Sequence, residues 1–216
     1  MESFLHEFWI ARYVLLSGLK MTVLISAASI LAGSLIGLVT GIALAYGPRP
    51  IAWLMRGYVD VVRGTPVLVL ILASFYVLAI AGIHFTAIES GIFALSIFCG
   101  AHMGEIVRGA LQAIPKTQTE AARSIGLTFS KILIYVLLPQ ALRQILPVWI
   151  NTGAELVKAS TLLSVIGVGE LLLSTQEIVG RNFQTLQFYT LAGVMYYCVN
   201  FAIESFGRHA ERRLRG

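Results

Sequence analysis

The sequence predicts an all-α membrane protein with about five transmembrane helices, its N-terminus outside and its C-terminus in the cytoplasm. Of its 216 residues, 57% are hydrophobic and 12% are charged, a balance far from that of a soluble domain. The apolar residues also run in long charge-free stretches, and a helix needs about 20 such residues to cross a hydrocarbon core of about 30 Å. Residues 1–216 are therefore expected to form a single transmembrane domain.

Residues 1–19 read as an amphipathic lead-in at the outer surface. Trp9 and Tyr13 suit the headgroup layer of a membrane, and the acidic residues Glu2 and Glu7 argue against a signal peptide. The first span is expected from Lys20 to Tyr46. It carries small side chains at every fourth position, which lets another backbone approach closely in lipid, and the expected partner is a helix of the same chain. These positions are Ser29, Gly33, Gly37, Gly41 and Ala45.

Glycine and proline residues set the limits of the next elements. The sequence Gly-Pro-Arg-Pro at 47–50 ends the first span, and residues 51–62 then predict a short interfacial helix. A second span is expected from Pro66 to about Ile83, because proline is favoured in the first turn of a helix. A short outer turn leads into a third span, which returns inward to about Ala110.

Two further spans are expected after residue 133. The fourth occupies residues 139–158 and is bent near Pro147. Gly167 and Gly169 make the following outer segment irregular, and the fifth span covers about 186–206 before a basic tail.

The net charge of +5 reflects topology and not nucleic-acid binding. In the expected orientation, all but four of the 16 Lys and Arg residues fall at or near the cytoplasmic side. This asymmetry follows the rule that cytoplasmic loops are enriched in basic residues. The four outer ones are Arg12, Lys20, Lys158 and Arg181.

Residues 112–133 form a polar, basic loop that is expected in the cytoplasm. Thr117 to Glu120 fits a capping box at the start of a helix, and Gly126 can adopt the left-handed conformation that ends one. Thr128 or Ser130 can begin the next helix. Two short helices that project from the membrane would suit a cleft in another protein.

This loop resembles the EAA loop of ABC importer permeases. Glu120, Ala121 and Ala122 are followed at the family's spacing by Gly126, and then by Leu138 and Pro139. Other blocks resemble the polar amino-acid branch of that family, the histidine, glutamine, arginine and opine type. The chain departs from the pattern at Ala159, where relatives often have a polar residue, and at Thr117, where glycine is common. The resembling blocks are 63–66, 105–109, 139–143 and 158–162.

The resemblance implies the architecture of a type I ABC importer permease in the cell inner (plasma) membrane. It implies that the EAA loop docks on a dimer of separate ATPase subunits, which bind ATP-Mg. The chain itself has no phosphate-binding loop of the form G-x-x-x-x-G-K-[ST] and is not expected to be an enzyme or to hold a cofactor. The other implied partners are a second permease subunit, the same or paralogous, a periplasmic solute-binding protein, the lipid bilayer and a polar amino-acid substrate.

Ionisable groups inside a membrane are costly and usually line a cavity or pair with one another. One interpretation is a polar lining for the ammonium and carboxylate of a zwitterion. In the other, Glu105 and Arg108 anchor the inner interface, Glu155 pairs with Lys158, and the histidine is simply buried and hydrogen-bonded. The candidates for the substrate path are His102, Glu105, Asn151, Glu155, Lys158 and Thr161.

The sequence argues against two other classes of membrane protein. An intramembrane enzyme would need a nucleophile with a base or a set of metal ligands, and the sequence has no such motif. A secondary transporter or channel not driven by ATP is the stronger alternative. It would be expected to show repeated halves, and no convincing repeat is found.

Overall fold

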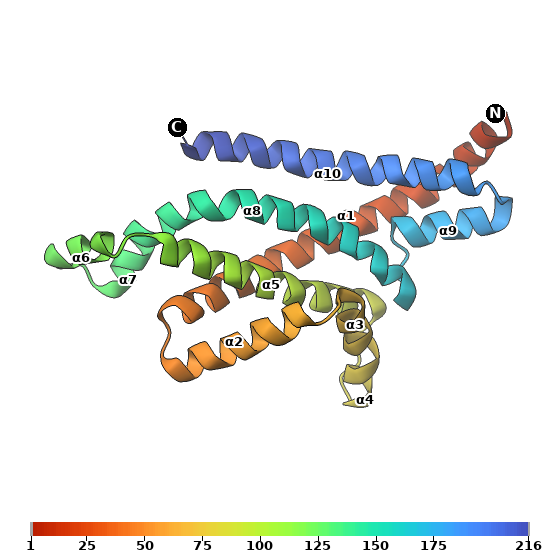
Figure 1. Ribbon diagram of the computed structural model, residues 1–216. Helices are drawn as coiled ribbons and strands as arrows, with labels where there is room; N and C mark the ends of the chain where they lie inside the picture. The colour runs from red at the N-terminus through yellow and green to blue at the C-terminus, as the bar shows by residue number, and fades with distance from the viewer. Residues whose placement is uncertain (1, 216) are drawn as a thin grey trace.

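The computed structural model describes residues 2–215 and the side chains of residues 4–209, and within this range it contains helices and no strand (Figure 1). The long helices lie roughly along one direction, so the molecule is an elongated bundle. The N-terminus lies at one end of the bundle. The C-terminus lies toward the other end, where α6 and α7 also project.

The centre of the bundle is the pair α1 (Glu2–Tyr46) and α5 (Ala87–Ala113). The expected stripe of small residues on α1 faces α5 and lets the two backbones come close together. A Cβ at Gly41 would lie 2.5 Å from Cβ of Val107, and Gly33 and Gly37 meet Cys99 and Met103 in the same way. The prediction that this stripe packs against the chain's own helix is therefore confirmed.

The expected lead-in at residues 1–19 is not a separate element. Its described residues form the first part of α1, which is continuous from Glu2 to Tyr46. Ala11 and Leu15 are buried against Leu171, Ile178 and Phe188, so this part of the helix packs on α9 and α10. The continuity is reasonable because no proline interrupts the chain before Pro48.

The short helix expected at 51–62 is present as α2 (Arg49–Gly64), and it lies against α5 and α1 (Figure 1). Its placement at the membrane interface stays a prediction. Helix α2 forms a bent pair, at 110°, with the helical segment Val67–Ile80 that begins after Pro66. That segment is made of α3 (Val67–Leu72), the π-helical η1 (Ala73–Val77) and α4 (Leu78–Ile80). At 1.5 Å per residue it is about 21 Å long, too short to cross a membrane alone.

The second half of the chain also follows the expected order. After α6 (Lys116–Ser124), α7 (Phe129–Ile132) and the π-helical η2 (Leu133–Leu137), α8 (Leu138–Ala159) carries Pro147 within it. The irregular segment expected around Gly167 and Gly169 is the 3₁₀ helix η3 (Ser160–Ile166), which ends at Gly167 with φ of 80°, followed by α9 (Leu171–Asn182). Helix α10 (Thr185–Arg215) closes the chain.

The described residues hold four to five candidate membrane spans, a number compatible with the five expected. Among the described residues, four helical stretches are long and apolar enough to cross a membrane, and the bent pair makes a fifth if it counts as one span. The four stretches are Phe4–Tyr46, Ala87–Ala113, Phe129–Ile166 and Thr185–His209.

The contact between α1 and α5 makes a testable prediction at Gly41. Gly41→Val should lower the thermal unfolding midpoint of the purified permease, because overpacking a close contact costs about 1–3 kcal/mol. Gly193→Val on α10 is the matched control, since a Cβ there meets no atom within 4 Å. The control should stay within about 0.5 kcal/mol of the parent protein. Equal midpoints for the two variants would contradict a close backbone contact at Gly41.

Candidate functional site: the hairpin between α5 and α8

The polar loop forms a hairpin of two short helices at one end of the bundle (Figure 1). Helix α5 ends at Ala113, and Ile114 and Pro115 connect it to α6. Leu111 and Ile114 are buried in the main core, so the junction between α5 and α6 is packed and not a free linker.

The capping box expected at Thr117 and Glu120 is wrong. Helix α6 begins at Lys116, directly after Pro115, and no side chain caps its first turn. Proline has no N–H to leave unsatisfied and its φ is already suited to a helix start, so the helix begins earlier than a threonine cap would allow. A capping box does occur in the chain, at Thr86 and Glu89 at the start of α5.

Gly126 ends α6 as expected. Its φ is +82°, in the left-handed region that favours glycine. The Gly126 N–H donates to the Arg123 carbonyl at 2.9 Å. The Leu127 N–H donates to the Ala122 carbonyl at 3.1 Å, and together these bonds are the pattern of a Schellman motif. Thr128 then stands at the N-cap position of α7, one of the two starts expected there.

The residues of the EAA pattern divide between the inside and the outside of the hairpin. Ala122 is 6% exposed and belongs to the main core, whereas Glu120 and Ala121 are exposed on α6. Leu138 and Pro139 lie at the start of α8, so they fix the return of the chain into the bundle. The sequence reasoning missed Ile125, which is 78% exposed next to Gly126. A large apolar side chain within a polar loop is the sequence feature that could have pointed to Ile125.

The hairpin is also attached to the end of α1. The Phe129 ring of α7 lies 5.2 Å from the Tyr46 ring in an edge-to-face arrangement. The Tyr46 hydroxyl donates to the Leu111 carbonyl of α5 at 3.5 Å. The hairpin therefore contacts both members of the central helix pair.

Three of the candidate substrate-path residues share one face of α8. Asn151, Glu155 and Lys158 are spaced four and three apart, and all are exposed. Among the described side chains, no ion pair joins Glu155 to Lys158, so the alternative in which they neutralise each other gains no support. Thr161 is half-buried in η3 and its hydroxyl donates to the Lys158 carbonyl at 2.7 Å. Exposed charges on a spanning helix require a polar environment, which a water-filled path or another subunit can supply.

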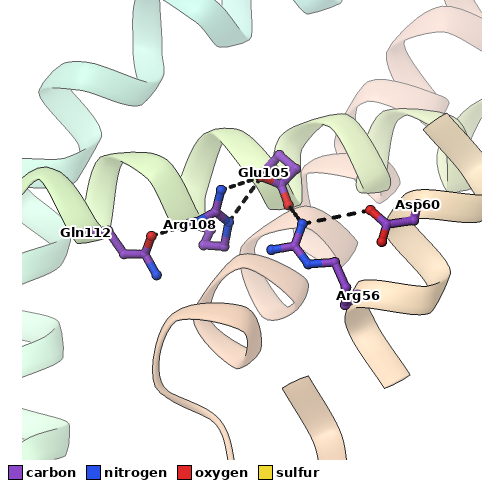
Figure 2. Close-up of polar contacts among 5 residues, drawn as sticks. All are labelled: Arg56, Asp60, Glu105, Arg108 and Gln112. Carbon is purple, nitrogen blue, oxygen red and sulfur yellow. Dashed lines mark hydrogen bonds and ion pairs between the residues drawn. The ribbon is translucent and has the colours of Figure 1, made fainter. Parts of the chain in front are cut away.

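The other two candidates lie on α5 and already have partners. His102 is half-buried, and its Nδ1 lies 3.0 Å from the Phe98 carbonyl. The Glu105 carboxylate lies between the guanidinium groups of Arg56 and Arg108, which approach it from α2 and α5 (Figure 2). These contacts agree with a hydrogen-bonded, structural His102 and with a Glu105 that pairs with Arg108, whereas a substrate role for either residue stays a prediction.

Sequence reasoning missed a buried carboxylate at the other end of the bundle. Glu170 has no exposed surface and caps α9, accepting from the backbone N–H groups of Leu172 and Leu173, both at 2.9 Å. The Tyr196 hydroxyl of α10 donates to it at 2.5 Å, and the Thr22 hydroxyl of α1 lies 3.5 Å away. Glu170 thus joins three helices. The sequence feature that could have revealed Glu170 is an acidic residue directly before the start of an apolar helix, where it can cap the first turn.

Apolar spanning helices, a polar strip on one of them and a packed hairpin at one end define a membrane transport subunit. The chain belongs to the family of binding-protein-dependent transport system inner membrane components, whose profile matches residues 12–216. It is therefore a multi-pass inner-membrane permease subunit of an ABC importer, a transport component and not an enzyme.

Individual relatives agree with this assignment. L-cystine transport system permease protein TcyB of Bacillus subtilis (strain 168) is 35% identical over 202 residues, 93% of this chain and 86% of that protein. Glutamine transport system permease protein GlnP of Escherichia coli (strain K12) is 32% identical over 209 residues, 96% of this chain and 95% of that protein. These relatives favour the ATP-driven permease over the secondary transporter or channel.

Solved structures match over nearly the whole chain. A crystal structure of an amino acid ABC transporter with histidines contains a chain that matches with a TM-score of 0.86 and 31% identity, covering 95% of this chain and 97% of that one. A chain of the inward-facing MetNI methionine ABC transporter matches with a TM-score of 0.82 and 23% identity over 94% of this chain and 97% of that one, so it shares the fold. The expected fold class is confirmed.

Proposed function

We propose that this permease imports a polar amino acid or a related compound, with α6 docked on a separate ATPase subunit. The packed hairpin is the observation that carries the proposal. Its exposed residues Glu120, Ala121 and Ile125 offer a surface, and the buried Ala122 ties that surface to the core. A surface attached in this way can both bind a partner and move the helices behind it.

The ATPase would lie in the cytoplasm, where ATP is found. This places α6 on the cytoplasmic side, and the C-terminus, which lies toward the same end of the bundle, would be cytoplasmic too (Figure 1). The N-terminus, at the opposite end, would be outside, in keeping with the distribution of basic residues. ATP-Mg would be bound by the ATPase dimer, and this chain would hold no cofactor of its own.

Transport would work by a shift between two populations. Closure of the ATPase dimer on ATP can favour one permease conformation only if the dimer binds that conformation more tightly than the other. The docked α6 would supply this difference, because Ala122 of α6 and Leu111 of α5 belong to the same buried core. The permease would then alternate between inward-open and outward-open states.

The substrate path would follow the polar face of α8. A zwitterion needs a negative group for its ammonium and a positive group for its carboxylate, and Glu155 and Lys158 supply one of each, a turn apart. The names of the relatives, an L-cystine and a glutamine permease, support an amino-acid substrate. A second permease subunit, the same or paralogous, would complete the path, and a periplasmic binding protein would deliver the substrate.

Docking on α6 can be tested at Ala121. Ala121→Arg should abolish co-purification of the ATPase, because a long charged side chain would stand on the contact surface. Thr185→Arg is the matched control, because Thr185 is exposed at the start of α10, at the other end of the bundle. Both variants should keep the parent's thermal stability, since both positions are exposed. Normal ATPase retention by Ala121→Arg would contradict docking at this face.

The substrate path can be tested at Glu155 and Lys158. Glu155→Gln or Lys158→Gln should lower uptake into proteoliposomes by about tenfold or more, because a hydrogen bond to a charged group contributes about 1.5–3 kcal/mol. ATPase co-purification should not change. Glu177→Gln, at an exposed position on α9, is the matched control. If both α8 variants import substrate at the parent's rate, the assignment of Glu155 and Lys158 to the substrate path is wrong.

A further inference from the structure

We propose that Glu105 clamps the bent helix pair, α2 with α3, to α5, so that the pair moves together with the coupling helix α6. This inference rests on the proposed function, because it requires α6 to receive the ATPase. Glu105 is then a positioning residue and not a substrate ligand.

Both oxygens of the Glu105 carboxylate are occupied. Oε1 accepts from Nη1 of Arg56 on α2, and Oε2 accepts from Nε and Nη2 of Arg108 at 3.0 and 2.7 Å (Figure 2). Gln112, one turn further along α5, accepts from Arg108 Nη1 at 2.5 Å and fixes its orientation. Three donors from two guanidinium groups thus engage both oxygens of the carboxylate, which accounts for its charge without a substrate.

The cluster is neutral as a whole. Two guanidinium groups face two carboxylates, since Asp60 lies 3.9 Å from Arg56. The Glu105 side chain is 15% exposed, whereas that of Asp60 is 64% exposed, so the inner pair contributes more than the outer one. Arg56 is 42% exposed, so the pair is only partly shielded. Removal of Glu105 would still leave the two guanidinium groups without the carboxylate that lies between them, which weakens the arrangement.

A second polar contact fastens α2 to α5 further from the hairpin. The Tyr58 hydroxyl donates to the Ile97 carbonyl at 2.7 Å, in a place where Gly100 leaves room for the ring. Val59 and Val62 pack on Ala101 in a small core of their own. The second half of α2, from Arg56 to Val62, is thus held against α5, and the ion pair is the contact that lies nearer to α6 along α5.

The chain connects this clamp to the hairpin on one side and to the bend on the other. Glu105 lies about two turns before the end of α5, where the packed junction to α6 begins. On the other side, α2 continues after Arg56 to Gly64 and turns by 110° into α3. A displacement of α6 would reach α3 through α5, the Glu105–Arg56 pair and α2.

The test uses the complete complex of permease, ATPase and binding protein in proteoliposomes. Glu105→Gln and Arg56→Gln should each lower the substrate imported per ATP hydrolysed by about tenfold, within the usual range of coupling between two sites. The double variant should lose no more than the worse single variant, because both residues act through one interaction. Asp60→Asn is the control and should stay within about twofold of the parent, as expected for an exposed pair.

The outcomes separate this inference from the proposed function. If both single variants keep the parent ratio of import to hydrolysis, or if the losses multiply in the double variant, the clamp is wrong although the ATPase is retained. If the parent permease does not retain the ATPase at all, the proposed function fails, and the clamp with it.

A second measurement does not depend on the folding of these variants. Spin labels at Trp53→Cys on α2 and Gly109→Cys on α5 occupy exposed positions, in a chain with Cys99 and Cys198 replaced by alanine. The distance between the labels should be the same in nucleotide-free and ATP-bound complexes. A distance that changes between these states would overturn the clamp.

Discussion

The structure depends on the close contact between α1 and α5. Because Gly33, Gly37 and Gly41 carry no side chain, two long helices meet almost backbone to backbone and form a rigid centre. The other elements attach to this centre. Helix α2 is bound to α5 by Tyr58 and Arg56, and α9 is joined to α1 through Thr22 and Glu170. The hairpin of α6 and α7 follows α5 directly and touches the end of α1 through Tyr46 and Phe129.

The two ends of the bundle therefore differ in what they hold. At one end, the hairpin offers an exposed surface that is supported from behind by buried residues such as Ala122. At the other end, Glu170 gathers α1, α9 and α10 around one buried carboxylate. Between them, Asn151, Glu155 and Lys158 give the second half of α8 a polar face. A transporter needs these three features: a surface for the motor, a path, and a frame that connects them.

Features that follow from local chemistry were predictable from the sequence, and features that depend on tertiary contacts were not. The left-handed Gly126, the break at 47–50 and the stripe on α1 each follow from residue types at fixed spacing. The placement of α2 does not, because its amphipathic pattern fits a membrane surface as well as the side of α5. The start of α6 was misjudged because Pro115 competes with Thr117 as a helix start. The partners of Glu105 and Glu170 come from distant parts of the chain, which no local pattern reveals.

Amide hydrogen exchange across residues 116–127 would test most directly whether α6 is the surface that receives the ATPase. Exchange would be followed for the purified permease alone and for the permease bound to its ATPase. Docking on α6 predicts slower exchange in this segment on complex formation, while exchange in α9, at the far end of the bundle, stays the same. Equal exchange at 116–127 in the free and bound permease would contradict the assignment of α6 as the docking surface.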